Sequence, residues 1–171
     1  MLVAINAGHC PGLDPGACGN YSEEANIVKS VAEVVCEDLH KVGIQSIFIQ
    51  ENELEDICDI ANGANADLFI SIHCNAASPE AHGTETFYCS GSENGRQLAQ
   101  CIQDQLIGTL GTTDRGLKTN SLYVTKHTNM PAVLTELAFI SNPDEEELLN
   151  NNINEMAHAI ARGITDYMCT K

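Results

Sequence analysis

Residues 66–76 read ADLFISIHCNA, a strongly apolar stretch that ends near a histidine. The run from Leu68 to Ile72 is typical of a β-strand buried on both faces, and His73 follows it directly. The chain opens in the same way, because residues 3–10 read VAINAGHC and place His9 just after a second such run. The carboxyl ends of parallel strands meet at one edge of an open α/β sheet, so we expect the two histidines to lie close together.

A glutamate lies in a third strand pattern of this type. Residues 131–142 read PAVLTELAFISN, where Glu136 is surrounded by apolar residues. An unpaired carboxylate on a buried strand is costly, which favours a functional role over a structural one. A second glutamate, Glu24, opens the helix expected after the first strand. The residues therefore predict one site that combines His9, Glu24, His73 and Glu136.

These residue types suit a zinc-dependent hydrolase. A hydrolytic zinc site uses three nitrogen or carboxylate ligands and leaves one position open, and His9, Glu24 and His73 supply that number. Zinc lowers the pKa of bound water to about 7 and polarises the carbonyl under attack. Glu136 can then take a proton from the water and deliver it to the departing amine. We expect one zinc ion, with Glu136 as the catalytic residue.

The chain has eight cysteines, which raises the question of disulfides and thiolate ligands. No CxxC pair is present, and a chain of this length can bury a core without disulfides, so we expect none. Cys10 and Cys74 each follow a candidate histidine, and thiolate binds zinc well. Neighbouring side chains on a strand point to opposite faces, however, so Cys74 is not expected to share a metal ion with His73.

Strand and helix patterns alternate along the chain, without internal repeats or linkers. Apolar spacings of three and four residues predict a helix that Ser22 caps, and further helices over 57–64, 95–110 and 153–167. Strands are predicted over 2–7, 44–50, 68–72, 84–89, 121–125 and 131–136, with 84–89 at an edge of the sheet. This alternation predicts a single α/β domain over residues 1–171.

Charge and hydropathy exclude several classes of function. The formal net charge is -16, and nucleic acids or anionic polymers need clustered Lys or Arg, so we expect no nucleic-acid binding. No apolar run approaches the roughly 18 to 20 residues that span a bilayer, so membrane insertion is not expected. Met1 runs directly into the first strand, and we expect synthesis in the cytoplasm without a signal peptide.

Several stretches in a fixed order carry a family resemblance that covers nearly the whole chain. They are AINAGHCPGLDPGACG (4–19), ADLFISIHCNA (66–76), GTETFYC (83–89), DRGLKTNSLYV (114–124) and PAVLTELAFISNPDE (131–145). In them the chain resembles the zinc-dependent N-acetylmuramoyl-L-alanine amidases of the type 3 family, which cut bacterial peptidoglycan. The resemblance implies a twisted, mostly parallel sheet with helices on both faces.

The resemblance also implies the role of each site residue. His9, Glu24 and His73 correspond to the zinc ligands and Glu136 to the catalytic glutamate. Glu23 is a rival to Glu24, but counting from the DPGA segment to the helix-opening glutamate of the family favours Glu24.

The resemblance implies hydrolysis of the amide between the lactyl group of N-acetylmuramic acid and L-alanine. Peptidoglycan is then the partner, and we expect a monomer that reaches the cell wall by release or by another export route. A phage lysin, a sporulation enzyme and an autolysin domain all fit this description. Two other functions remain open: a different zinc peptidase or amidase that acts on wall peptides, and a non-catalytic module that binds them.

One departure from the family concerns the residue that orients a ligand. Asn6 stands where the family usually has an aspartate, and we expect it to orient His9 by a hydrogen bond. Tyr88, Asn75 and Leu122 are candidates to line the substrate groove.

Overall fold

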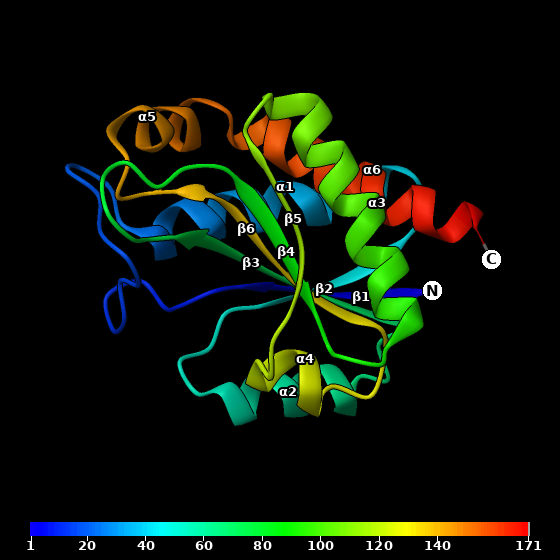
Figure 1. The fold of residues 1–171 in the computed structure, drawn as a ribbon. Coiled ribbons are helices and arrows are strands. Elements are labelled where there is room, and N and C mark those ends of the chain that lie inside the picture. The colour runs from blue at the N-terminus through cyan, green and yellow to red at the C-terminus, as the bar shows by residue number, and fades with distance from the viewer. Residues whose placement is uncertain (171) are drawn as a thin grey trace.

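The chain folds around a six-stranded sheet (Figure 1) in a computed structural model that describes residues 1–170. The strands are β1 (Leu2–Ala7), β2 (Gln45–Ile49), β3 (Leu68–Asn75), β4 (Thr84–Tyr88), β5 (Asp114–Thr119) and β6 (Ala132–Phe139). Their order across the sheet is β2-β1-β3-β6-β4-β5, and only the pairing of β4 with β6 is antiparallel. The expected mostly parallel α/β sheet is therefore confirmed.

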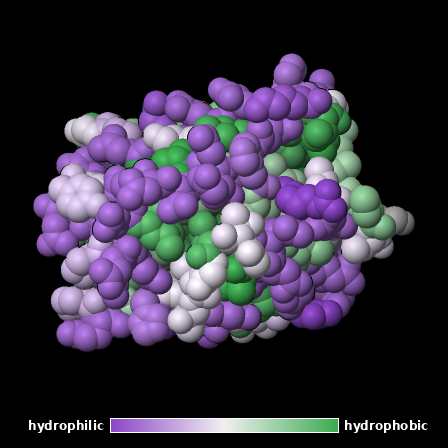
Figure 2. All heavy atoms as spheres, turned by 90° about the horizontal axis from the view of Figure 1, so that it is seen from above, coloured by the Kyte–Doolittle hydropathy of each residue, from purple (hydrophilic) through white to green (hydrophobic). Residues whose placement is uncertain are grey.

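Helices cover both faces of this sheet. They are α1 (Glu24–Lys41), α2 (Leu54–Gly63), α3 (Glu93–Leu110), α4 (Tyr123–His127), α5 (Pro143–Asn151) and α6 (Ile153–Cys169). In Figure 1, α1, α3 and α6 lie on one side of the sheet, and α2 and α4 lie on the other. Figure 2 views the first side from above and shows hydrophilic side chains over most of its outer surface. Among the described residues, no helix combines the length and the apolar character that crossing a membrane requires.

Alternation along the strands decides which side chains reach the site. Ile70 and Ile72 of β3 belong to the larger core, beneath α1, α3 and α6, whereas Phe69 belongs to the smaller core beneath α2 and α4. His73 has the same parity as Phe69, so it leaves the sheet on the side of α2 and α4. Glu136 is the register partner of His73 in the pairing of β3 with β6, so both side chains leave the same face.

Two strand predictions between residues 84 and 125 are wrong. Residues 121–125 do not form a strand: α4 begins at Tyr123, and the β-branched Val124 and Thr125, which favoured the strand prediction, are buried in this helix. The strand lies earlier, at β5, where Gly116 at φ 76° and polar neighbours weaken the apolar pattern. Because β5 forms the edge of the sheet, the strand at residues 84–88 is internal rather than an edge strand.

Helix α5 was not predicted, although its first turn carries clear signals. The Asn142 side chain accepts hydrogen bonds from the backbone N–H groups of Asp144 and Glu145, and Pro143 occupies the first turn. The helix is short, and its four acidic residues, two of which are buried, interrupt the apolar periodicity that predicts a helix.

The predicted cap of α1 is also wrong, because Ser22 serves another partner. The N-cap residue of α1 is Glu23, which makes no side-chain capping bond. Ser22 Oγ instead donates to Glu146 Oε1 at 2.7 Å.

Glu146 anchors the loop that leads into Glu24. Its buried carboxylate accepts hydrogen bonds from the backbone N–H groups of Asn20, Tyr21 and Ser22, and from the side chains of Asn20 and Ser22, at 2.7–3.0 Å. A Cβ atom on Gly19 would lie 2.3 Å from Glu146 Oε1, so this loop position has no room for a side chain.

Replacing Glu146 by glutamine should lower the free energy of unfolding by about 2 kcal/mol, because an amide NH2 group would then face N–H donors. The exposed neighbour Glu147 gives the matched control, and Glu147→Gln should change stability by less than about 0.5 kcal/mol. Urea denaturation of the two variants and the wild type measures both values. Equal stability of all three proteins would contradict the anchoring role.

The same carboxylate should make stability depend on pH. Burial alone would raise the pKa of Glu146, but the hydrogen bonds from Tyr21, Ser22 and Asn20 outweigh it and lower the pKa from 4.5 to about 2. A group whose pKa falls on folding stabilises the fold above its unfolded pKa and loses that contribution as the pH falls through the folded value. Between about pH 4.5 and about pH 2, the wild type should therefore lose stability more steeply than Glu146→Gln, as measured by denaturation at each pH.

Candidate metal centre and active site

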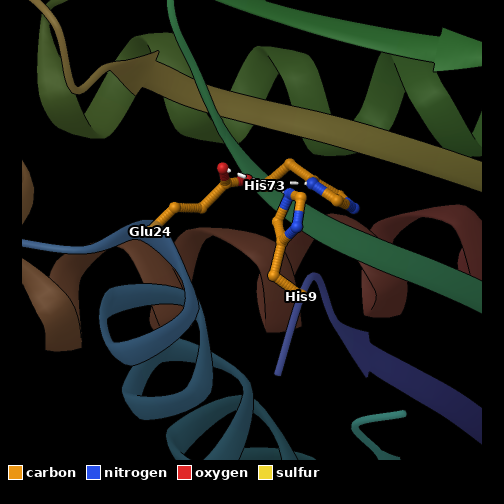
Figure 3. A group of neighbouring side chains, drawn as sticks. All are labelled: His9, Glu24 and His73. Carbon is orange, nitrogen blue, oxygen red and sulfur yellow. Dashed lines mark hydrogen bonds and ion pairs between the residues drawn. The ribbon is translucent and has the colours of Figure 1, made fainter. Parts of the chain in front are cut away.

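Three of the predicted site residues meet at the edge of the sheet. His9 lies two residues after β1, Glu24 is the first residue of α1, and His73 lies near the end of β3. Figure 3 shows their side chains gathered together, and one ligand atom from each lies within 4.8 Å of the others. Glu23 is exposed, takes a hydrogen bond from Asn26 and does not belong to this cluster.

The carboxylate of Glu24 forms the centre of the cluster. Its Oε1 lies 2.9 Å from His73 Nδ1 and accepts the backbone N–H of Cys74 at 2.9 Å. Its Oε2 lies 3.3 Å from His9 Nε2 and accepts the backbone N–H of Ala17 at 2.8 Å. The side chain is only 3% exposed, so backbone donors replace much of the water that a carboxylate normally binds.

This arrangement favours positive charge between the two rings. Burial opposes ionisation of Glu24, but the hydrogen bonds with His73 and His9 hold its pKa well below the usual range. The hydrogen bond with Glu24 also raises the pKa of His9 to about 9, against the effect of burial and with help from Asp14. A buried, ionised carboxylate between two imidazoles attracts a cation, and a proton on His9 and a divalent metal ion compete for that place.

Asp14 orients His9. Its Oδ2 lies 2.6 Å from His9 Nδ1, and its Oδ1 accepts the backbone N–H of Gly16 at 3.0 Å. The expectation that Asn6 fulfils this role is wrong, because Asn6 bonds to Ser71 and to the carbonyls of Ala7 and Ile49. Asn6 leaves β1 on the face of Ala4 and of the smaller core, whereas Asp14 reaches back to His9 from the following loop.

The backbone around His9 is shaped for the cluster. His9 has φ 60°, a left-handed conformation that is uncommon for a residue other than glycine and is often found at functional sites. A Cβ atom on Gly8 would lie 2.3 Å from the His73 ring. A Cβ atom on Gly16 would lie 2.6 Å from both His9 and Glu24. Both glycines therefore leave space that the site side chains occupy.

The cysteines next to the histidines lie outside the cluster. Cys74 is buried, and its alternating position directs its side chain to the opposite face of the sheet from His73. Burial raises the pKa of the Cys74 thiol well above its usual value, so it stays neutral. Cys10 is likewise absent from the group of neighbouring ligand atoms. The structure offers no support for thiolate ligation here.

Glu136 lies beside this cluster with an unsatisfied oxygen. Its Oε2 is buried and has no hydrogen-bond partner in the described structure, which is costly unless the oxygen has another role. It pairs in register with His73 on one side and with Glu85 on the other. Burial, the largest effect, raises the pKa of Glu136 to about 7. A carboxyl group with such a pKa can both accept and donate a proton near neutral pH.

A cavity of about 340 Å³ opens beside the two histidines. Leu122 lines it, together with Leu54 and Tyr123 of the two helices on this face, and Glu51 contributes a negative charge. Tyr88 packs against the core on the opposite face, and Asn75 donates to Glu85, so neither lines the cavity. A larger cavity of about 690 Å³, between residues 18–23 and α1, contains none of the predicted catalytic groups.

Two imidazoles and one carboxylate match the donor set of hydrolytic zinc sites, which keep a fourth position open. The hydrogen bonds to Asp14 and to backbone N–H groups are the kind of outer contacts that orient metal ligands. On this chemistry, His9, Glu24 and His73 can hold a zinc ion.

Asp14, Glu85 and Glu146 were not identified from the sequence. Asp14 had a local signal, since it follows His9 by five residues in the same irregular loop. Glu85 reaches the site region through the pairing of β4 with β6. Glu146 reaches it through contacts with a loop that lies more than 120 residues earlier in the chain.

The sequence matches the family described as N-acetylmuramoyl-L-alanine amidase over residues 3–166. It is 39% identical over 173 residues to the uncharacterized protein YqiI of Bacillus subtilis (strain 168), with coverage of 96% of this chain and 84% of that protein. It is 36% identical over 174 residues to the N-acetylmuramoyl-L-alanine amidase LytC of the same organism, covering 96% of this chain but only 35% of LytC.

The fold is similar to that of the N-acetylmuramoyl-L-alanine amidase from Clostridium difficile 630. The TM-score is 0.93 at 31% sequence identity, and the match covers 99% of this chain and 97% of that chain. The sequence match and the shared fold agree with the resemblance found in the sequence motifs. The chain therefore belongs to the N-acetylmuramoyl-L-alanine amidase family.

Proposed function

We propose that this chain, an amidase by family, hydrolyses the amide between the lactyl group of N-acetylmuramic acid and L-alanine in peptidoglycan, with one zinc ion held by His9, Glu24 and His73. Glu136 is the catalytic residue. One observation carries the proposal: a cluster of two histidines and a buried carboxylate lies beside a glutamate whose buried oxygen has no partner.

Zinc bound to this cluster would polarise the carbonyl under attack and make water a stronger nucleophile at neutral pH. Glu136 takes a proton from the attacking water as the new carbon–oxygen bond forms. It then delivers that proton to the nitrogen of L-alanine as the carbon–nitrogen bond breaks. The products are a lactyl carboxylate on the glycan and a peptide with a free L-alanine amino terminus.

The surrounding residues hold these groups in place. Asp14 fixes the ring of His9, and the backbone N–H groups of Ala17 and Cys74 fix the carboxylate of Glu24. The sheet fixes Glu136 beside His73. Because the ligands and the catalytic carboxylate come from adjacent strands and the start of one helix, the geometry exists before substrate binds, which favours catalysis.

The cell wall is the place of action that this proposal implies. The chain spans about a third of the length of LytC, which is named as an N-acetylmuramoyl-L-alanine amidase. Release by a phage and export by the host are both compatible with the proposed chemistry.

Incubation of the zinc-loaded protein with purified peptidoglycan should release new L-alanine amino termini, and a chelator should abolish the release. Added zinc should restore it. Labelling of amino termini before and after incubation measures the reaction. Release of a free terminal amino acid would indicate a different peptidase, and the absence of any release from a folded, zinc-loaded protein would refute the proposed activity.

Glu136→Gln should reduce turnover by about a hundred- to ten-thousand-fold, because the amide cannot accept the proton from water. Its zinc content and thermal stability should stay close to those of the wild type, because Glu136 is not in the ligand cluster. Metal analysis and peptidoglycan assays measure these properties. Glu147→Gln, at an exposed position, is the control and should retain activity. Near-normal turnover in Glu136→Gln would exclude the catalytic role.

A further inference from the structure

The face of the sheet that carries Glu136 also carries two cations. Glu136 is the direct partner of Glu85 in the pairing of β6 with β4. One strand further, Arg115 Nε donates to Glu85 Oε2 at 2.9 Å. Lys118 of β5 is the register partner of Phe87, which packs against the smaller core on this same face. Arg115 and Lys118 therefore extend the row of site residues toward the edge of the sheet.

Arg115 is held in a defined position. Its guanidinium lies 4.8 Å from the centre of the Phe139 ring, and Nη1 also donates to the carbonyl of His82 at 3.3 Å. Glu85, which holds it, is itself fixed by a hydrogen bond from Asn75 at 2.9 Å. The Arg115 side chain is still 38% exposed, so solvent and ligands can reach it. An arginine fixed in this way loses little conformational freedom when it binds an anion.

These two residues differ from most of the other basic residues that the structure describes. Four of those others pair with a carboxylate three or four residues away on their own helix: Lys29, Lys41, Arg96 and Arg162. Arg115 pairs across strands with a largely buried carboxylate, and Lys118 Nζ donates to the backbone carbonyl of Arg115 at 2.6 Å. The Lys118 ammonium therefore lies against the backbone of Arg115.

The two sides of the bond in the proposed substrate differ in charge. The glycan side of the cleaved amide has no carboxylate near the bond, since the lactyl carboxyl forms the amide itself. The stem peptide that follows L-alanine does carry carboxylates. A chain with a net charge of -16 repels such a peptide, and the cavity beside His9 adds Asp14 and Glu51.

We propose that Arg115 and Lys118 form a subsite that binds a carboxylate of the stem peptide, on the side of Glu136 opposite the cavity. The proposal rests on the proposed function, because it assumes a peptidoglycan substrate. In this proposal the acidic cavity of about 340 Å³ binds the uncharged glycan part of the substrate, and the edge of the sheet at β5 binds the peptide part.

The test compares two soluble substrates that differ only in charge. One is N-acetylmuramoyl-L-alanyl-γ-D-glutamyl-L-lysine, and the other is the same compound with its peptide carboxylates converted to carboxamides. For the acid, Arg115→Gln should raise KM about tenfold and Lys118→Gln about threefold, with kcat little changed, as expected for lost charge-assisted hydrogen bonds at a partly exposed site. For the amide, both variants should behave like the wild type. Arg96→Gln, which removes an exposed arginine that pairs with Glu93 on α3, is the control.

Two kinetic outcomes would overturn the subsite. Equal effects of Arg115→Gln on both substrates, with a fall in kcat, would mean that Arg115 acts through Glu85 on Glu136 rather than on the peptide. Unchanged KM values for both variants would mean that neither cation contacts the substrate. If Arg115→Gln fails to fold because Glu85 is left buried and unpaired, Lys118→Gln carries the comparison, since it leaves that ion pair intact.

A binding measurement separates this proposal from the proposed function. Calorimetry with the free tripeptide L-alanyl-γ-D-glutamyl-L-lysine needs no turnover. If the zinc-loaded wild type cleaves neither substrate but binds the tripeptide more tightly than Arg115→Gln does, the amidase activity is refuted and the anion subsite stands. Equal binding by the wild type and both variants, or no binding at all, would remove the subsite whatever the activity.

Discussion

The burial of one ionised carboxylate, that of Glu24, determines much of the architecture around the candidate centre. Both of its oxygens are bonded to backbone N–H groups, one from the loop after β1 and one from β3, and both also face a histidine ring. A carboxylate in such a place is stable only if these donors and a positive charge are provided together. The first strand, the third strand and the first helix therefore have to meet at this point, whether the positive charge is a proton or a metal ion.

Two of the three glutamates of α5, Glu145 and Glu146, hold the same region from the other end of the chain. Glu146 holds the loop at residues 19–22, directly before Glu24, while Glu145 accepts the backbone N–H groups of Gly83 and Phe139. These bonds connect the loop before α1, the start of β4 and the end of β6 to a single helical turn. Glu145 and Glu146 therefore hold the backbone around the site, although neither carboxylate belongs to the ligand cluster.

Local sequence patterns predicted the family and the general fold. Most of the features that they did not predict depend on contacts between residues far apart in the chain. The apolar runs before His9, His73 and Glu136 placed three strands correctly, and the sheet brings these residues together as expected. The ligand set and the metal remain proposals. Three predictions were wrong: the strand at residues 121–125, the cap at Ser22 and the role of Asn6. In each case a tertiary contact decides the structure or the hydrogen-bond partner, and the local sequence does not show that contact.

The reversed direction of β4 has a consequence for how such a site can diversify. Because β4 is antiparallel to β6, and β5 follows β4, the beginnings of these two strands lie at the same edge as the ends of β1, β3 and β6. On this half of the molecule, the bordering loops, residues 76–83 and 111–113, come before a strand instead of after it. Insertions or deletions in these loops would reshape the surface at this edge of the sheet without shifting the strands next to His9 and His73, so the loops on the β4 and β5 side can change in length independently of the ligands.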